Sequence, residues 1–320
     1  MLSVSKKYDD YIIRAESRTF LPKSLSNINN VNKTTTFHID GDFLNIKNAK
    51  YDISGRYLQA DGTQYPVGSN VRLVDNFVAY LFFIIEVKKN NTVINKIENV
   101  GRASTIKGTV SYSHEWSGLN MNSGFQSNYE GGGRFQAVGN LSNLCLGFFK
   151  DIKYPIFKGG IEINFIRNSD DEVIFRDKNK SNDTTPSVGK VIIDEFTIRI
   201  PFIEYDEIMK IKLLKELEEL SREDKYRLEF KDWQCIEERN VRVKTFVKDL
   251  MSEYRNVNNP LFVIVGFQTN RLDSQLKNAS VLDHCNVKNI WVELEGRRYP
   301  EEMLNLDFKN EKYGLVYDML

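Results

Sequence analysis

The residues best suited to chemistry in this chain lie in one short run. Asp283, His284 and Cys285 are consecutive, and they are the residue types of a catalytic triad with a cysteine nucleophile. Triad members come together in space from separate parts of a chain, so adjacency in the sequence is no evidence for catalysis. We therefore expect none of the three to be catalytic and the protein not to be an enzyme.

A second pair of residues has the types that a metal site uses. His38 and Asp40 alternate in "FHIDGD", which would place both side chains on one face of a strand. No third ligand is apparent, and Asp40-Gly41 is a strong turn signal. The motifs G-x-S-x-G, Cys-x-x-Cys and H-E-x-x-H are absent from the sequence. We expect no metal ion and no cofactor.

The composition indicates a packed protein without net charge. The chain has 320 residues, and 41% of them are hydrophobic. It has 44 Lys+Arg and 44 Asp+Glu, and this balance argues against a protein that coats nucleic acid by charge alone. Three widely spaced cysteines do not make a disulfide framework. The N-terminus lacks the apolar core of a signal peptide, and the longest apolar run, Phe77 to Ile85, is too short to span a bilayer. We expect no membrane span and a setting inside the cell.

The elements that position these residues are predicted to be strands from Phe37 to Phe202. Apolar residues recur at every second position in two stretches: Ile161, Ile163 and Phe165, and then Phe196, Ile198 and Ile200. This period of two is typical of half-buried strands. The run from Phe77 to Val87 is apolar on both faces, as expected for a strand that is covered on both sides.

One clear helix follows, predicted from about Asp206 to Leu220 by apolar residues at helical spacing and acidic residues at its start. Strands then resume in "YRLEFKDW", "VRVKTFV", "LFVIVGF", "NIWVELEG" and "YGLVYDML". We expect "LFVIVGF" to be a core strand that pairs with "NIWVELEG". The sequence shows no βαβ alternation, so two sandwiches of antiparallel strands fit best, in an all-β fold class with a minor helical part.

The long Gly/Ser/Asn-rich segment from Ser117 to Arg134 is a candidate interface, because long irregular segments inside a β domain are usually functional or interfacial. It holds or adjoins five apolar or aromatic residues, and aromatic residues are enriched at the centres of interfaces. We expect them either to pack at a contact between subunits or to fold back on their own sandwich: Trp116, Leu119, Met121, Phe125 and Tyr129.

Residues 1–36 are polar, with few periodic apolar positions, and predict an N-terminal arm rather than a packed unit. Six Lys/Arg against three Asp/Glu would allow this arm a weak contact with nucleic acid. The predicted division is therefore an arm over residues 1–36, a first β unit over 37–204, and a second β unit with an internal helix over 205–320.

A series of stretches in fixed order resembles one family. The stretches are "NVGRASTIKGTVSY", "LCLGFFKDIKYPIFKGGIEINFIRN", "IRIPFIEYDEIMKIKLLKELE", "FVIVGFQTNRLDSQLKNASVLDHCNVKNIWVELEGRRYPEEMLNLDF" and "YGLVYDM". Together they are similar to the major capsid proteins of small eukaryotic DNA viruses and Polinton/adintovirus-like elements, including copies integrated in insect genomes. The resemblance runs from about residue 37 to the C-terminus.

The resemblance implies a double jelly roll whose chains form homotrimers, the pseudo-hexagonal capsomers of an icosahedral shell. It implies a location in the virion after assembly in the nucleus or cytoplasm, and penton or minor capsid proteins as further partners. Chains of that family generally continue past the Tyr-Asp-Met stretch, so we expect the second roll to be incomplete. Two alternatives stay open: a jelly-roll protein that binds a carbohydrate or other ligand, with Trp116 and Tyr129 as the candidate aromatics, and a virus-derived protein adopted by a host.

Overall fold

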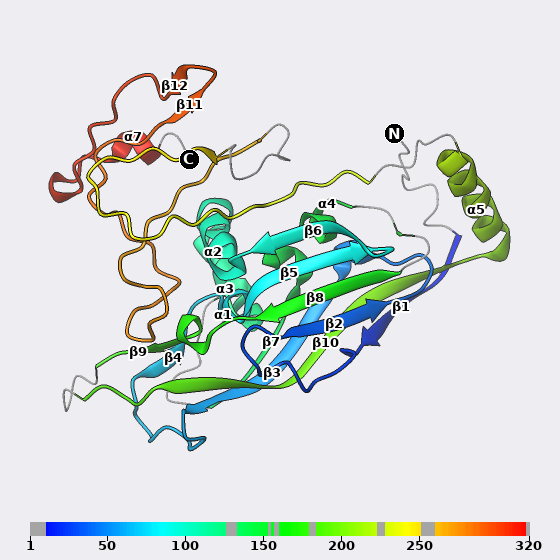
Figure 1. Ribbon diagram of the computed structural model, residues 1–320. Coiled ribbons are helices and arrows are strands. Elements are labelled where there is room, and N and C mark those ends of the chain that lie inside the picture. Colours follow the sequence, from blue (N-terminus) through cyan, green and yellow to red (C-terminus); the bar gives the residue numbers. More distant parts are fainter. Residues whose placement is uncertain are drawn as a thin grey trace.

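Two antiparallel sheets of four strands each lie face to face in the first part of the molecule (Figure 1). The computed structural model describes residues 11–125, 133–152, 155–156, 160–178, 184–222, 228–250 and 260–317. The first sheet has the order β1-β10-β3-β7, with β1 (Ile12–Phe20), β10 (Gly189–Tyr205), β3 (Lys50–Gln59) and β7 (Arg134–Asn140). The second has the order β2-β8-β5-β6, with β2 (Thr34–Ile39), β8 (Ile161–Arg167), β5 (Phe82–Lys89) and β6 (Thr92–Glu98).

The path of the chain through these sheets is that of a jelly roll. Of the connections between the eight strands, only the β5–β6 hairpin stays within one sheet, and all the others cross to the facing sheet. A short antiparallel pair, β4 (Val71–Leu73) and β9 (Ile174–Arg176), extends one end. Eight strands in this order make a complete jelly roll, which we call the first roll.

The core of the first roll is an aromatic cluster between the sheets. Phe37 of β2, Phe82 of β5, Phe165 of β8 and Phe196 of β10 are buried, with ring centroids 4.9–5.7 Å apart. Most of the contacts are edge-on, the arrangement that aromatic quadrupoles prefer. The alternating residues of "GGIEINFIR" and "DEFTIRIPF" face this core, as the sequence predicted.

Six α-helices lie outside the sheets: α1 (Phe77–Tyr80), α2 (Val100–Ser111), α3 (His114–Leu119), α4 (Gly147–Asp151), α5 (Glu207–Arg222) and α7 (Gly314–Tyr317), counted over the described residues. Helix α5 confirms the helix predicted from about Asp206 to Leu220. The run from Phe77 to Val87, predicted to be one strand, is instead a helical turn, α1, followed by β5. Helix α1 is buried and β5 is buried or half-buried throughout, so apolar character alone could not distinguish them.

The prediction of an arm over residues 1–36 is wrong for the part that the structure describes. Residues 12–20 form β1, which pairs antiparallel with β10 over eight residue pairs, and β2 also begins before residue 37. Only the end residues of β1, Ile12 and Phe20, are half-buried, and the seven between them are exposed on both faces. Hydrogen bonds between backbones hold β1 in the sheet. Its side chains therefore show no alternation of apolar and polar residues that would predict a strand.

The chain after α5 forms far fewer strands than the sequence predicted. Within residues 228–250 and 260–317, the paired strands are β11 (Val292–Leu294) and β12 (Arg297–Tyr299), a hairpin with Glu295 and Gly296 at positive φ in its turn. Over the described residues of the five predicted strands, only "NIWVELEG" contains a strand, and its partner is β12 rather than "LFVIVGF". A residue's preference for β structure depends on neighbouring strands, and few lie beside these stretches.

Candidate subunit interface

Three aromatic side chains gather where α2 leads into α3. Tyr112 and Trp116 stack with ring centroids 3.7 Å apart, and Phe125 meets them edge-on at 5.5 and 4.8 Å. Ser113 caps α3 by accepting a hydrogen bond from the backbone N–H of Trp116 at 3.1 Å. The structure therefore brings the predicted interface residues Trp116 and Phe125 together, half-buried against each other and Tyr112.

The other predicted interface residues lie differently. Leu119, at the end of α3, is 85% exposed, and Met121, two residues on, is 40% exposed. We call these two side chains the α3 surface. Tyr129 lies outside the described residues. Apolar side chains that face solvent beside a packed aromatic cluster are suited to a contact with another protein surface.

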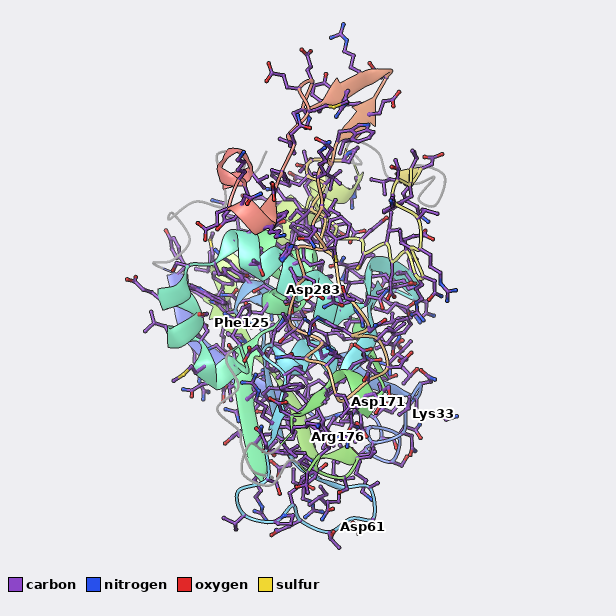
Figure 2. The ribbon with its side chains drawn as sticks, turned by 90° about the vertical axis from the view of Figure 1, so that its left-hand side faces the viewer. Lys33, Asp61, Phe125, Asp171, Arg176 and Asp283 are labelled. Atoms are coloured by element: carbon purple, nitrogen blue, oxygen red, sulfur yellow. The ribbon has the colours of Figure 1, made fainter. Side chains whose placement is uncertain are left out.

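A loop from the second half of the chain docks on the first roll, with Asp283 above Asp171 and Arg176 in Figure 2. We call residues 268–283 the docked loop. Its Gln275 is buried and forms hydrogen bonds with both backbone groups of Gly189, accepting from the N–H at 2.9 Å and donating to the C=O at 2.8 Å. Gln275 also donates to the Asp171 carboxylate at 2.9 Å. One amide side chain thus takes the place of a strand partner at the start of β10.

A buried ion pair reinforces the docking. Arg102 of α2 and Glu172 of the first roll lie 2.7 Å apart, with side chains only 12% and 3% exposed. Glu172 also accepts a hydrogen bond from the backbone N–H of Asp273 at 2.9 Å, and Arg102 donates to Gln268 at 3.1 Å. Both charges are therefore satisfied by partners that include the docked loop. Glu172 and Gln275 carried no recognisable signal in the sequence, since each lies within a short polar stretch that is typical of a turn.

Residues 228–235 lie along the outer strand of the second sheet, β6. Asn95 of β6 donates to Asp232 at 2.6 Å, and the backbone N–H of Lys231 donates to Asp151 at 2.9 Å. Burial raises the pKa of the Asp232 carboxyl above its usual range. A Cβ on Gly147 would lie 1.7 Å from the Lys231 carbonyl oxygen, so only glycine permits this close approach.

Comparison with known proteins identifies the family. A family model of the double jelly roll-like domain matches residues 71–320, which is most of the chain. The chain belongs to the double jelly roll-like domain family. No curated protein matches it.

Solved structures similar to this member of the double jelly roll-like family come from viruses. One is PBCV-1 VP54 fitted into a reconstruction of the virophage Sputnik, at 13% identity and TM-score 0.40, covering 65% of this chain and 46% of that chain. Another is the Faustovirus major capsid protein, at 10% identity and TM-score 0.36, covering 68% and 59%. The chain therefore spans about half the length of the structures it matches.

Asp283, His284 and Cys285 each have a separate partner in this double jelly roll-like protein. Asp283 pairs with Arg271 at 2.6 Å, and hydrogen bonds from Arg271 hold the pKa of Asp283 at about 2. His284 stacks on Phe308 at 4.6 Å, and Cys285 lies 3.4 Å from the Thr269 hydroxyl. These contacts hold the end of the docked loop in place.

His38 and Asp40 of "FHIDGD" have different surroundings. His38 lies 3.7 Å from Glu162 of the neighbouring strand β8, and Asp40 directly follows the end of β2. Within the residues that the structure describes, no cluster of three His, Cys, Asp or Glu could hold a metal ion. The same residues include no helix that is both long and apolar enough to cross a membrane.

The apolar stretch Leu261–Val265 is exposed in this chain. Leu261, Phe262, Val263 and Val265 have 65%, 67%, 44% and 51% of their surface accessible. Within the part of the chain that the structure describes, the backbone of Leu261–Val265 does not pair with another strand. A run of exposed apolar side chains is costly in water, because it lacks the cover that the strands of the first roll have.

Proposed function

We propose that this protein is a structural subunit of a capsid-type shell, that it has no enzymatic activity, and that it associates as a homotrimer. The observation that carries this proposal is a complete eight-stranded jelly roll in a chain of the double jelly roll-like family. A shell subunit acts through its surfaces. This agrees with the surroundings of Asp283, His284 and Cys285, whose side chains contact structural partners.

The α3 surface is the proposed contact between subunits. Leu119 and Met121 present apolar groups to solvent, while Tyr112, Trp116 and Phe125 hold the backbone beneath them in place. A specific interface typically buries more than about 1,000 Å², so neighbouring surface must contribute as well. The chain has a formal net charge of zero, and long-range repulsion between copies does not oppose association.

The wider assembly is part of the same proposal. Trimers would tile an icosahedral shell, which places the protein in the virion of a DNA virus or a related element. Penton or minor capsid proteins would close the shell. Contact with nucleic acid would be weak or indirect and would come from the N-terminal residues 1–36, which hold six Lys/Arg against three Asp/Glu.

The proposal is tested by measuring the solution mass of the purified protein by light scattering at micromolar concentration. We expect a trimer for the wild type and a monomer for the double variant Leu119→Ser, Met121→Ser. The matched control is Val67→Ser, which changes a fully exposed apolar residue on the loop between β3 and β4 and leaves the trimer intact.

Two outcomes would contradict the proposal in different ways. A monomeric wild type at micromolar concentration would reject the trimer. A trimer that persists in the double variant would keep the trimer and remove the α3 surface from its interface.

A further inference from the structure

Strand β1 lies at the edge of the first sheet (Figure 1). It pairs with β10 on one side, and no strand of the described residues pairs with its other side. The seven residues between Ile12 and Phe20 are exposed, Ile13 at 68%. An exposed edge strand can accept a strand from another chain, and proteins usually block such edges with proline, lysine or a covering segment. The sequence of β1, IIRAESRTF, contains neither proline nor lysine.

The directions of the backbone groups of β1 follow from its partner β10. Ser17 stands opposite Pro201, which has no N–H, and the Pro201 carbonyl accepts a hydrogen bond from Asn45 at 2.9 Å, on the side of β10 away from β1. In an antiparallel ladder, two opposite residues either bond to each other or both point away. The N–H and C=O of Ser17 therefore point outward from the sheet, and by alternation those of Ala15 and Thr19 do so too.

The charges of β1 complement those of a second copy of the same strand. Arg14, Glu16 and Arg18 alternate in sign along one face of β1. When two copies pair antiparallel around Ser17, Glu16 of each copy stands opposite Arg18 of the other, and opposite charges across a ladder are favourable. A pairing around Glu16 would place Glu16 opposite Glu16 and Arg14 opposite Arg18, which is unfavourable.

Two further features favour the register around Ser17. The ladder between β1 and β10 is regular over Arg14–Phe20, with its irregularity before that range, and the pairing around Ser17 uses the regular part alone. The guanidinium of Arg18 lies 3.8 Å from the centre of the Phe202 ring. This cation–π contact holds the charge of Arg18 on the face that Glu16 shares.

We propose that β1 of one copy pairs antiparallel with β1 of a second copy around Ser17, which joins two four-stranded sheets into one continuous sheet. Such a contact has twofold symmetry, uses the same surface on both copies and closes as a pair. It therefore differs from the threefold contact of the α3 surface and would link neighbouring trimers. In that role the inference rests on the proposed function, whereas the contact itself needs only two chains. A weak contact that recurs around a shell gains strength from its repetition.

The test uses the full-length double variant Leu119→Ser, Met121→Ser, which lacks the contact proposed for the trimer. We expect it to be monomeric at micromolar concentration and to dimerise with a dissociation constant of about 1 mM or somewhat tighter, because the interface is small. Sedimentation equilibrium up to about 1 mM protein measures this constant. Hydrogen exchange provides a second readout: the outward amide of Ser17 should gain protection as the concentration rises, while the amide of Glu16, which points toward β10, should not.

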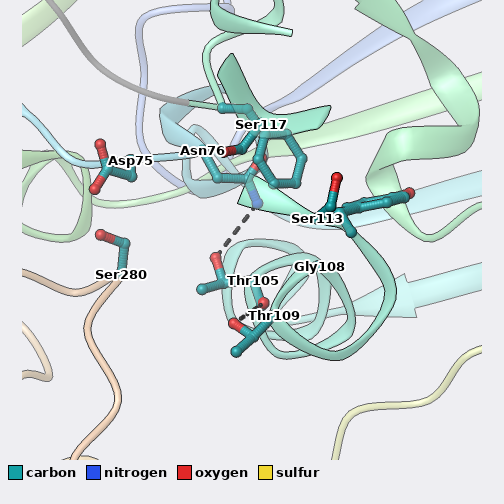
Figure 3. A pocket seen from close by; sticks show the side chains of 10 residues that line it. Asp75, Asn76, Thr105, Gly108, Thr109, Ser113, Ser117 and Ser280 are labelled. Atoms are coloured by element: carbon teal, nitrogen blue, oxygen red, sulfur yellow. Dashed lines mark hydrogen bonds between the residues drawn. The ribbon is translucent and has the colours of Figure 1, made fainter. Parts of the chain in front are cut away.

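Charge reversal tests the register. In the double variant, Glu16→Arg or Arg18→Glu should each weaken the dimer by about fivefold or more, because like charges then stand opposite each other. An equimolar mixture of the two should dimerise again, since every opposite pair then has unlike charges, and this recovery also shows that both variants are folded. The control is Thr109→Arg, which adds an arginine at an exposed position of α2, in the wall of the pocket in Figure 3, and should leave the dimer unchanged.

Three results would overturn the inference. They are protection of the Ser17 amide that does not depend on concentration, dimers of both charge variants as tight as the parent, and a mixture that associates no better than either variant alone. Failure of the β1 contact and failure of the trimer are told apart, because the trimer is measured on the wild type at micromolar concentration. The Ser17 amide reports β1 alone, whatever the effect of the substitutions at Leu119 and Met121.

Discussion

The first roll and the chain that follows α5 have similar apolar sequences and very different structures. Phe165 of the first roll is fully buried among three other phenylalanines, whereas Phe262 of "LFVIVGF" is 67% exposed. The first roll has eight strands in two sheets, and the described residues after α5 contain one short hairpin. An apolar, β-branched stretch becomes a strand only where other strands supply its hydrogen bonds and cover its faces.

The two regions are nevertheless joined by specific contacts. Gln275 and Glu172 are buried polar residues, and Asp232 is an exposed one, and the partners of all three lie across the boundary between the regions. The later region is therefore attached to the first roll although it forms no sandwich of its own within the described residues. This difference between the two regions predicts where substitutions change stability most.

The largest effect is expected for Phe165→Ala. Removing a buried aromatic ring from the core should lower the free energy of unfolding by about 3–5 kcal/mol. The matched variant Phe262→Ala should change it by less than about 0.5 kcal/mol, since an exposed side chain loses little packing. Urea unfolding of both variants measures the difference. A comparable loss for Phe262→Ala would show that this side chain is buried in solution and would break the comparison.

A smaller effect is expected for Gln275→Ala, which tests how the regions are joined. The substitution leaves the backbone groups of Gly189 without their partner in a buried position, at a cost of about 1–3 kcal/mol. The docked loop should also become more sensitive to trypsin at Lys277. The control, Gln64→Ala, alters an exposed glutamine and should match the wild type. Equal trypsin sensitivity in all three proteins would mean that Gln275 does not hold the loop.

The smallest effect is expected from acid. The pKa of Asp283 is held at about 2, below the ordinary value of about 3.9, so its pairing with Arg271 stabilises the fold above pH 4. This stabilisation should disappear as the pH falls toward 2. Asp283→Asn should be less stable than the wild type at neutral pH, and the difference should shrink below pH 4. If the difference in stability between Asp283→Asn and the wild type stayed the same down to pH 2, it would contradict this account of the Asp283 pKa. The control is Glu301→Gln, which changes an exposed carboxylate.

The sequence predicted well those elements whose side chains carry a period. The alternation around Phe165 and Phe196 placed two core strands, and the helical spacing after Asp206 placed α5. Strand β1 was missed because backbone hydrogen bonds to β10 hold it while its side chains face solvent. Almost any residue type can form hydrogen bonds between backbones, so the sequence does not reveal them.

The candidate site was predicted only in part, for a similar reason. Trp116 and Phe125 were recognisable because aromatic side chains stand out in a Gly/Ser/Asn-rich segment. Their partner Tyr112 directly follows α2, and only the fold brings the three rings together. The same holds for Gln275, whose role depends on a backbone 86 residues away.

Hydrogen exchange on the monomeric fraction of the protein tests most directly the claim that the first roll is a complete unit while Leu261–Val265 has no sheet of its own. The account predicts strong protection of the amides in β8 (Ile161–Arg167), which pairs with both β2 and β5. It predicts exchange near the rate of an unstructured peptide for Leu261–Val265. Protection of Leu261–Val265 comparable to that of β8 in the monomer would contradict it.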